Sequence, residues 1–284
     1  MPHLLRTSTP SLREPVVVAA FEGWNDAGEA ATFAAKFLAE RWNAEEFATI
    51  DPEEFFDFTS TRPQVQLDDD GLREIVWPKT TLSAASVPDS DLDVIFVVGT
   101  EPQLKWRTFC GEIVGVAREL GARMVMSLGA LLAEVPHSRP VSIVGTAYEP
   151  ELVQKMGLTQ STYQGPTGIV GVLHDAFRRA GVPSASLWAA VPTYVPSAPS
   201  PKAALALVER ITELFDTPVS TTDLEIASAS YERQIDSLVA DDEDTAEYVA
   251  RLEEAADDPP PLVDEPQGDL IAEVERFLRE NPSS

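Results

Sequence analysis

Several apolar runs of this sequence end in short polar segments that contain glycine, and these segments hold the residues that could do chemistry. Their carboxylates could act as a general acid and base if they converge. Their glycines could leave backbone N–H groups at the start of a helix accessible to an anion. Helix capping by Asn25 or Asp26 is the structural alternative. The candidate residues of a pocket or subunit interface are Gly23, Trp24, Asn25, Asp26, Gly99, Thr100, Glu101, Gly129, Gly165, Pro166, Thr167, Gly168, Pro192 and Tyr194.

The remaining reactive residue types give weaker signals. His137 of "VPHSRP" is expected at the surface, although it could approach Glu22 and Glu101, and His174 is expected to be half-buried within a helix. Cys110 lies among apolar neighbours, which predicts an inert thiol. The sequence holds no GxxxxGK[ST] loop, no GxGxxG turn and no GxSxG motif. We therefore expect no catalytic residue, no metal and no cofactor.

Composition excludes several classes of partner. The 284 residues carry 21 basic and 47 acidic side chains, a net charge of −26, which repels phosphate backbones and anionic lipids. The chain is expected to bind neither nucleic acid nor membranes. A single cysteine, an N-terminus without the apolar stretch of a signal peptide, and the lack of a long apolar run predict a cytoplasmic protein.

The elements that must position these residues alternate along the chain. Apolar, β-branched runs predict strands, and amphipathic stripes between them predict helices. This order predicts an α/β fold with three α/β/α layers and a mainly parallel sheet, whose ligands would bind beyond the carboxyl ends of the strands. "QVQLDDDGLREIVW" predicts a hairpin that makes the sheet mixed. The expected strands are 15–21, 92–99, 123–129, 141–147 and 185–195, and the expected helices are 26–40, 100–121, 168–181 and 199–215.

Three regions are expected along the chain. Residues 1–14 should be a flexible N-terminus, 15–218 the α/β core, and 219–284 an acidic helical extension with three apolar stripes. The segment 241–284 holds 15 acidic and 3 basic residues. It is either a solvated appendage packed on the core or a surface that binds a partner or another subunit.

A set of short motifs in fixed order resembles a known family. "VVVAAFEGWNDAG", "VVGTEP", "SLGA", "YQGPTGIVGVL" and "VPTYV" resemble the proteasome assembly chaperone 2 family, with the closest match in its actinobacterial branch. The resemblance covers roughly residues 12 to 280 and implies a core similar to purine nucleoside phosphorylase. It also implies ring-like or trimeric self-association. In the family that it resembles, archaeal members dock on the proteasome through a terminal hydrophobic–Tyr–any-residue tail. This sequence ends in "RENPSS", so that docking mode is not expected.

Two functional hypotheses remain open at this point. The first is a non-enzymatic assembly or interaction factor that forms a homo-oligomer, a trimer before other forms, with proteasome subunits as candidate partners. Trp24 and Tyr194 would then line the subunit interface. The alternative is an enzyme or small-molecule binder with an anionic or nucleoside-like ligand at the ends of the strands.

Overall fold

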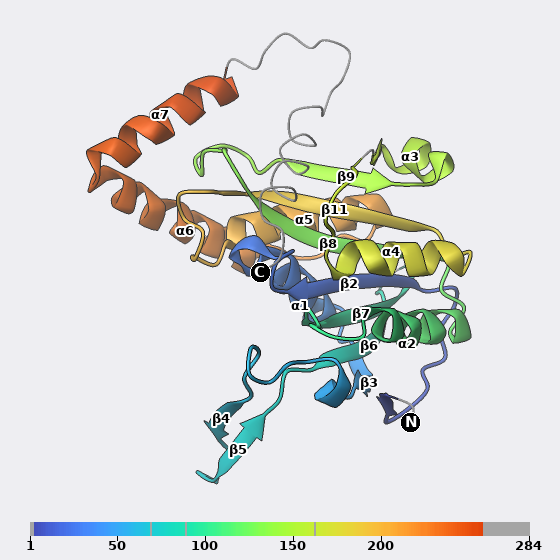
Figure 1. Ribbon diagram of the computed structural model, residues 1–284. Coiled ribbons are helices and arrows are strands. Elements are labelled where there is room, and N and C mark those ends of the chain that lie inside the picture. The colour runs from blue at the N-terminus through green and yellow to red at the C-terminus, as the bar shows by residue number, and fades with distance from the viewer. Residues whose placement is uncertain (1–2, 69, 89, 162, 258–284) are drawn as a thin grey trace.

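A nine-stranded sheet forms the centre of the computed structural model, which describes residues 3–257 except 69, 89 and 162 (Figure 1). The strand order is β1-β3-β6-β7-β2-β8-β11-β9-β10. The strands are β1 Leu4–Arg6, β2 Val16–Glu22, β3 Glu45–Ile50, β6 Thr80–Ser86, β7 Asp93–Thr100, β8 Met124–Ala133, β9 Ile143–Ala147, β10 Thr159–Gln160 and β11 Ser184–Pro192.

The four central strands are parallel, and the flanks make the sheet mixed. β7, β2, β8 and β11 run in one direction, and β1, β3 and β6 form an antiparallel flank beside β7. On the other side β9 pairs antiparallel with β11. The predicted α/β fold with a mixed, mainly parallel centre is confirmed. β9 runs opposite to the central strands, because only residues 134–142 connect it to β8, fewer than a parallel crossover needs.

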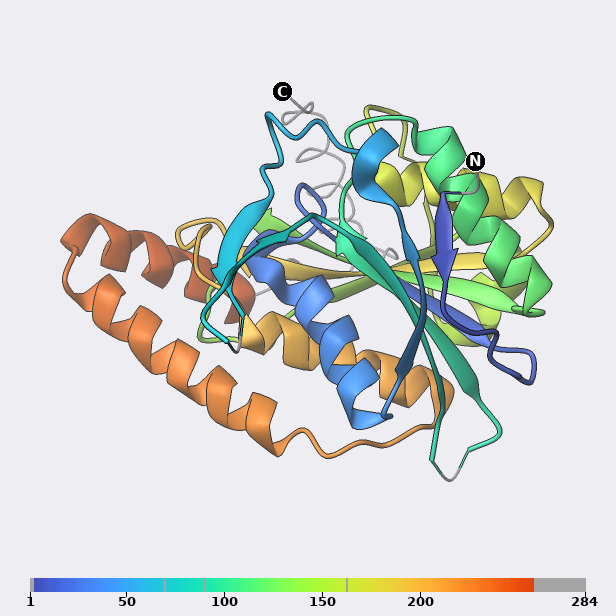
Figure 2. The same ribbon diagram turned by 90° about the horizontal axis from the view of Figure 1, so that it is seen from below.

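Helices cover both faces of the sheet, which gives the three predicted layers. α1 and α5 lie on one face, and α2 and α4 on the other (Figure 2). Val16 and Val18 of β2 pack into the apolar cluster on the side of α1 and α5. Val17 and Ala19 pack into the cluster on the side of α2 and α4. A strand buried on both sides needs this continuous apolar sequence. The helices are α1 Ala30–Arg41, α2 Trp106–Glu119, α3 Pro150–Met156, α4 Ile169–Arg179, α5 Pro201–Phe215, α6 Thr222–Ala240 and α7 Glu243–Asp257.

The predicted hairpin exists but lies apart from the main sheet. β4 Gln64–Leu67 pairs only with β5 Arg73–Val76, and every residue of both strands is exposed. The hairpin projects from the body of the molecule (Figure 1). The expectation that it makes the central sheet mixed was wrong, because β3, β6 and β9 supply the antiparallel pairs.

The two ends of the described chain add elements to the core. Within the N-terminal segment expected to be flexible, Leu4–Arg6 forms the edge strand β1 against β3. At the other end α6 and α7 form two of the three predicted helices, and the third apolar stripe lies outside the described residues. The boundary between core and extension at residue 218 stays a prediction. None of the helices described here combines the length and apolarity that a membrane span requires.

Candidate functional site

The "GWNDAG" segment forms a tight turn at the end of β2. Gly23 has a φ of 123°, a conformation that a side chain disfavours, and the N–H of Asp26 donates to the carbonyl of Gly23. The carbonyl of Asn25 accepts the N–H of Ala130 at 2.8 Å, so the chain crosses onto β8 directly after leaving β2. The turn therefore places Trp24 and Asn25 beside the central strands.

Asp26 caps α1 from within the protein. Its Oδ1 accepts the N–H of Ala31 at 2.7 Å and that of Thr32 at 3.3 Å, and its Oδ2 accepts the hydroxyl of Thr32 at 2.5 Å. Asp26 is buried, and this burial raises the pKa of its carboxyl above the ordinary value. The carboxylate is committed to three donors, which is the capping role that the sequence suggested for this residue.

Glu101 performs the corresponding role for α4, across 68 residues of sequence. Its Oε1 accepts the backbone N–H of Ile169 at 2.8 Å and the Nδ2 of Asn25 at 3.3 Å. The backbone N–H of Trp24 also donates to this carboxylate. A Cβ on Gly168 would lie 2.5 Å from the Asn25 Nδ2, so only glycine lets the three segments meet here. The first N–H groups of α1 and α4 are thus bound by the protein's own carboxylates.

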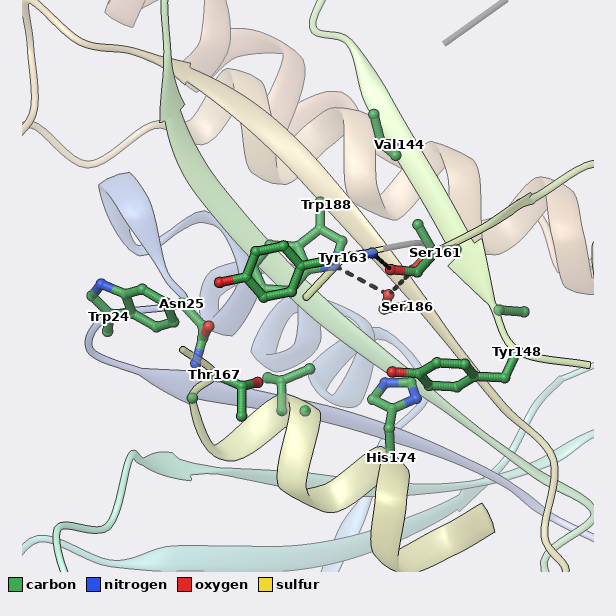
Figure 3. A pocket seen from close by; sticks show the side chains of 15 residues that line it. Trp24, Asn25, Val144, Tyr148, Ser161, Tyr163, Thr167, His174, Ser186 and Trp188 are labelled. Carbon is green, nitrogen blue, oxygen red and sulfur yellow. Dashed lines mark hydrogen bonds between the residues drawn. The ribbon is translucent and has the colours of Figure 1, made fainter. Parts of the chain in front are cut away.

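A cavity of about 100 Å³ opens between α4 and the neighbouring strands (Figure 3). Strands β9 and β11 form its floor, α4 forms one wall, and aromatic side chains from three loops close the rest. Its described lining residues are Trp24, Asn25, Val144, Thr146, Ala147, Tyr148, Ser161, Tyr163, Thr167, Gly168, Val170, Gly171, His174, Ser186 and Trp188.

The polar atoms of the pocket are linked in short chains. The Nε1 of Trp188 donates to the Oγ of Ser186 at 3.1 Å, and this Oγ lies 2.8 Å from the Oγ1 of Thr146. On α4, the Nε2 of His174 lies 2.7 Å from the buried Oγ of Ser127. Burial lowers the pKa of His174 to about 4, so its imidazole is neutral at neutral pH. The expectation of a half-buried His174 was wrong, because it is only 6% exposed.

Four of the sequence candidates border this pocket directly: Trp24, Asn25, Thr167 and Gly168. Others support it from outside. Gly129 lies in contact with the Trp188 ring, and the carbonyl of Pro166 accepts the Tyr163 hydroxyl at 2.6 Å beside Gly165. Gly129 was expected after a strand end, but β8 continues to Ala133. Sequence reasoning missed the β9 and β11 residues, although the alternation of Ser186 and Trp188 signals one face of a strand.

Gly99 and Thr100 face a different hollow, next to the β4–β5 hairpin. The Thr100 hydroxyl donates to Glu22 Oε2 at 3.1 Å, while Glu22 Oε1 accepts Lys36 Nζ at 2.7 Å. The carboxylate of Glu22 is therefore paired with a cation, in contrast to those of Asp26 and Glu101. The three acidic residues that could have met at the strand ends have separate partners.

Pro192 and Tyr194 lie at a third place, under the helical extension. The Tyr194 hydroxyl accepts the backbone N–H of His137 at 2.7 Å, and the Tyr194 ring packs edge-on against Tyr248 of α7. Burial raises the pKa of Tyr194 to about 12. His137 is 4% exposed and its Nε2 lies 3.0 Å from Asp236 of α6, so the surface position expected for it was wrong.

Neighbouring residues of the same loop hold α7. Arg139 forms a two-pronged contact with Asp257 at 2.6 and 2.7 Å, and the Ser138 hydroxyl donates to Glu253. The extension is thus attached to the β8–β9 loop through side chains that lie far apart in sequence.

Cys110 and possible metal ligands are the remaining reactive groups. Cys110 is buried, and burial raises its thiol pKa to about 12, which keeps the sulfur protonated. In the part of the chain that the structure describes, no group of three or more His, Cys, Asp and Glu side chains could hold a metal ion.

Fold and site together define an α/β protein with a large mixed sheet, internally capped helices and a small aromatic pocket. The chain belongs to the PAC2 family, whose model matches residues 20–239. A Streptomyces avermitilis PAC2 family protein of known structure is 46% identical over 83% of this chain and 99% of that chain, with a TM-score of 0.77.

Two Mycobacterium tuberculosis structures are also similar to this chain. One is described as a proteasome-assembly chaperone homologue, with 44% identity over 82% of this chain and 99% of that chain and a TM-score of 0.74. The other, described as a protein of unknown function, is 28% identical over 100% and 98% of the two chains, with a TM-score of 0.84. Comparison with curated proteins gave no match.

Proposed function

We propose that this protein is a non-enzymatic assembly or interaction factor that associates with itself, with a trimer as the form to be expected first. Membership of the PAC2 family supports an assembly-chaperone type of role. A cytoplasmic location is part of the proposal. Catalysis has less support than an interaction role. The titratable side chains among the described pocket residues are His174, Tyr148 and Tyr163, and the His174 imidazole is hydrogen-bonded to the Ser127 hydroxyl.

The β4–β5 hairpin is the observation that carries this proposal. Val65 pairs with Ile75 in register and Leu67 pairs with Arg73, so an apolar stripe of Val65, Ile75 and Leu67 shares its face with one arginine. Trp77 follows directly after β5. The four apolar side chains are exposed, by 44% to 70%. An isolated two-stranded hairpin is marginally stable in water, and an apolar stripe of this kind usually marks a contact with another protein.

The occupant that we propose for the stripe is a second copy of this chain. The charge distribution supports this choice, because Arg62 lies in the hollow beside the hairpin on a chain with 47 acidic residues. Lys36 and Lys79 line the same hollow and pair with Glu22 and Glu46 of this chain. The acidic α7 of a neighbouring copy would complement the Arg62 guanidinium. Proteasome subunits are the candidate external partners, since a 44% identical protein is described as a proteasome-assembly chaperone homologue.

Light scattering coupled to size-exclusion chromatography tests self-association. We expect the wild type to run as an oligomer and Leu67→Lys/Ile75→Lys to run as a smaller species. Ile226→Lys is the matched control, because this α6 side chain is 65% exposed and lies away from the hairpin. A wild type that stays monomeric at tens of micromolar, or a hairpin variant that keeps the wild-type mass, would overturn the proposed interface.

A pull-down of the tagged protein from its own host's extract, read by mass spectrometry, tests the external partner. Enrichment of proteasome subunits by wild type over untagged extract supports the assembly role. Recovery of the protein alone argues against that partner and leaves self-association to be judged by light scattering.

A further inference from the structure

We propose that the cavity between α4 and strands β9 and β11 binds an uncharged, planar aromatic ligand that carries a hydrogen-bond acceptor at its edge. This is a small-molecule site in addition to the interaction role above, and it does not depend on that role. The cavity measures about 100 Å³ and is open at one side. Apolar cavities of this order hold a single aromatic ring.

The walls favour a flat ring. Trp24 and Tyr163 lie on one side of the cavity, Trp188 lies on its floor, and Tyr148 lies beside His174 (Figure 3). Aromatic rings interact with such neighbours in offset-stacked or edge-to-face geometry. Val144 and Val170 complete the apolar surface. A ring inserted here would replace its contacts with water by contacts with aromatic faces on more than one side.

The described lining of the cavity offers no opposite charge to an ionic ligand. Among the described residues that line the cavity there is no lysine, arginine, aspartate or glutamate. The carboxylates of Glu101 and Asp26, beside the β2 turn, are occupied by backbone donors. A charged ligand would lose hydration without meeting an opposite charge, which is costly in a partly enclosed site. This distinguishes the site from the anionic ligand that the glycine-rich turns suggested.

The floor of the cavity keeps a hydroxyl donor for a ligand. The Oγ of Ser186 accepts the Trp188 N–H and shares a single hydrogen bond with the Thr146 hydroxyl. Two hydroxyl groups supply two protons, and one bond between them uses one. Whichever hydroxyl donates to the other, the second O–H stays available at the floor of the cavity. The acceptor of the ligand would take this proton.

Three compounds of one shape and different charge test the site: benzamide, benzoate and benzamidine. Benzamide is neutral and carries a carbonyl acceptor, benzoate is an anion and benzamidine is a cation at neutral pH. We would measure dissociation constants by ligand-observed NMR titration of the full chain. Benzamide is expected to bind at least about tenfold tighter than either ion. No binding of benzamide, or equal binding of an ion, would overturn the proposal.

Two pairs of variants locate the bound ring. Trp24→Ala removes a wall and is expected to weaken benzamide binding about tenfold, whereas Trp77→Ala removes an exposed tryptophan on the hairpin and should leave binding unchanged. Thr146→Leu fills the cavity without removing a wall, and Thr49→Leu alters another half-buried strand threonine on β3. Folding of each variant is checked by circular dichroism. Wild-type affinity in both folded pocket variants would show that benzamide binds elsewhere and would refute the assignment.

Discussion

Glu101 and Ile169 are joined by a hydrogen bond of 2.8 Å from the Ile169 backbone N–H to the Glu101 carboxylate, although they lie 68 positions apart. The same carboxylate accepts the Asn25 side chain and the Trp24 backbone. One side chain after β7 thus fixes both the turn after β2 and the start of α4. The wall of the aromatic pocket depends on this three-way contact.

Removal of that contact should cost stability. Glu101→Ala leaves the N–H of Ile169 without its acceptor, and we expect a loss of about 1–2 kcal/mol in the free energy of unfolding. Glu101→Gln keeps an acceptor oxygen and should lose less. Urea unfolding followed by circular dichroism measures both. Equal losses in the two variants would contradict a capping role.

The same carboxyl group predicts a pH dependence. Burial raises the pKa of Glu101 above its ordinary value of 4.5, so the folded protein holds the proton more tightly than the unfolded chain. This group therefore favours folding below pH 4.5, and that contribution is lost as the pH rises through the folded pKa. The stability of Glu101→Gln relative to wild type should increase between about pH 4 and about pH 7. Urea unfolding at both ends of this pH range measures the difference in free energy of unfolding between Glu101→Gln and wild type. A difference that stays constant with pH would contradict the prediction.

Asp26→Ala should destabilise α1 without changing ligand binding. The substitution removes an acceptor from the buried N–H groups of Ala31 and Thr32, at an expected cost of about 2 kcal/mol. Asp26→Asn, which can still accept one N–H, is the conservative control. Thermal unfolding gives the stability, and the benzamide titration gives the affinity. Lost affinity in a fully stable Asp26→Ala protein would assign Asp26 to the site instead.

His174 should make the protein sensitive to mild acid. Burial lowers its pKa from 6.5 to about 4, so its contribution to stability is present above pH 6.5 and is lost as the pH falls towards 4. The loss from this group at pH 5 is expected to be about 2 kcal/mol. His174→Gln should lack this component. Unfolding curves of wild type and His174→Gln at pH 7 and pH 5 measure this difference. An identical pH dependence of the free energy of unfolding in the two proteins would refute a buried neutral imidazole.

Arg139→Ala should loosen α7 while the core stays intact. The lost partners are Asp257 and Glu253, which are solvent-accessible, so we expect little change in the global free energy of unfolding. Hydrogen exchange of α7 amides should become faster, and high salt should have the same effect on wild type. Arg118→Ala, a change on α2 away from the extension, is the control. Unchanged exchange in α7 would show that the other contacts, the Ser138–Glu253 hydrogen bond and the packing of Tyr248 and Val249, hold the helix.

The apolar centre of the fold could be predicted because its sequence is unambiguous. β2 and β7 are short apolar runs rich in β-branched residues, which is typical of strands buried on both faces. β3 and β6 escaped prediction because "EEFATI" and "TTLSAAS" mix small and polar residues. Their strand conformation depends on partners in the sheet, since β6 pairs with β7 and β3 pairs with β6. The direction of β9 follows from the short connection 134–142 to β8, which the strand's own residues do not encode.

The candidate site could be predicted only in part. Trp24 and Gly168 follow strand-to-helix turn chemistry and do border the pocket. The Glu101–Ile169 contact joins residues far apart in sequence, so no local pattern reveals it. Tyr194 shares the predicted strand-end position but lies under α7, because the extension returns to cover that end of β11. Its role at a subunit interface stays a prediction.

The strand order has a consequence for synthesis of the chain on the ribosome. Val16 of β2 pairs with Val94 of β7 and Met124 of β8, separations of 94 − 16 = 78 and 124 − 16 = 108 residues. At a synthesis rate of about 5–20 residues per second, β2 waits roughly 5 to 20 seconds before both neighbours exist. During that time one of the most apolar segments is unpaired. Holdase chaperones that bind nascent chains should therefore recognise residues 15–22 first.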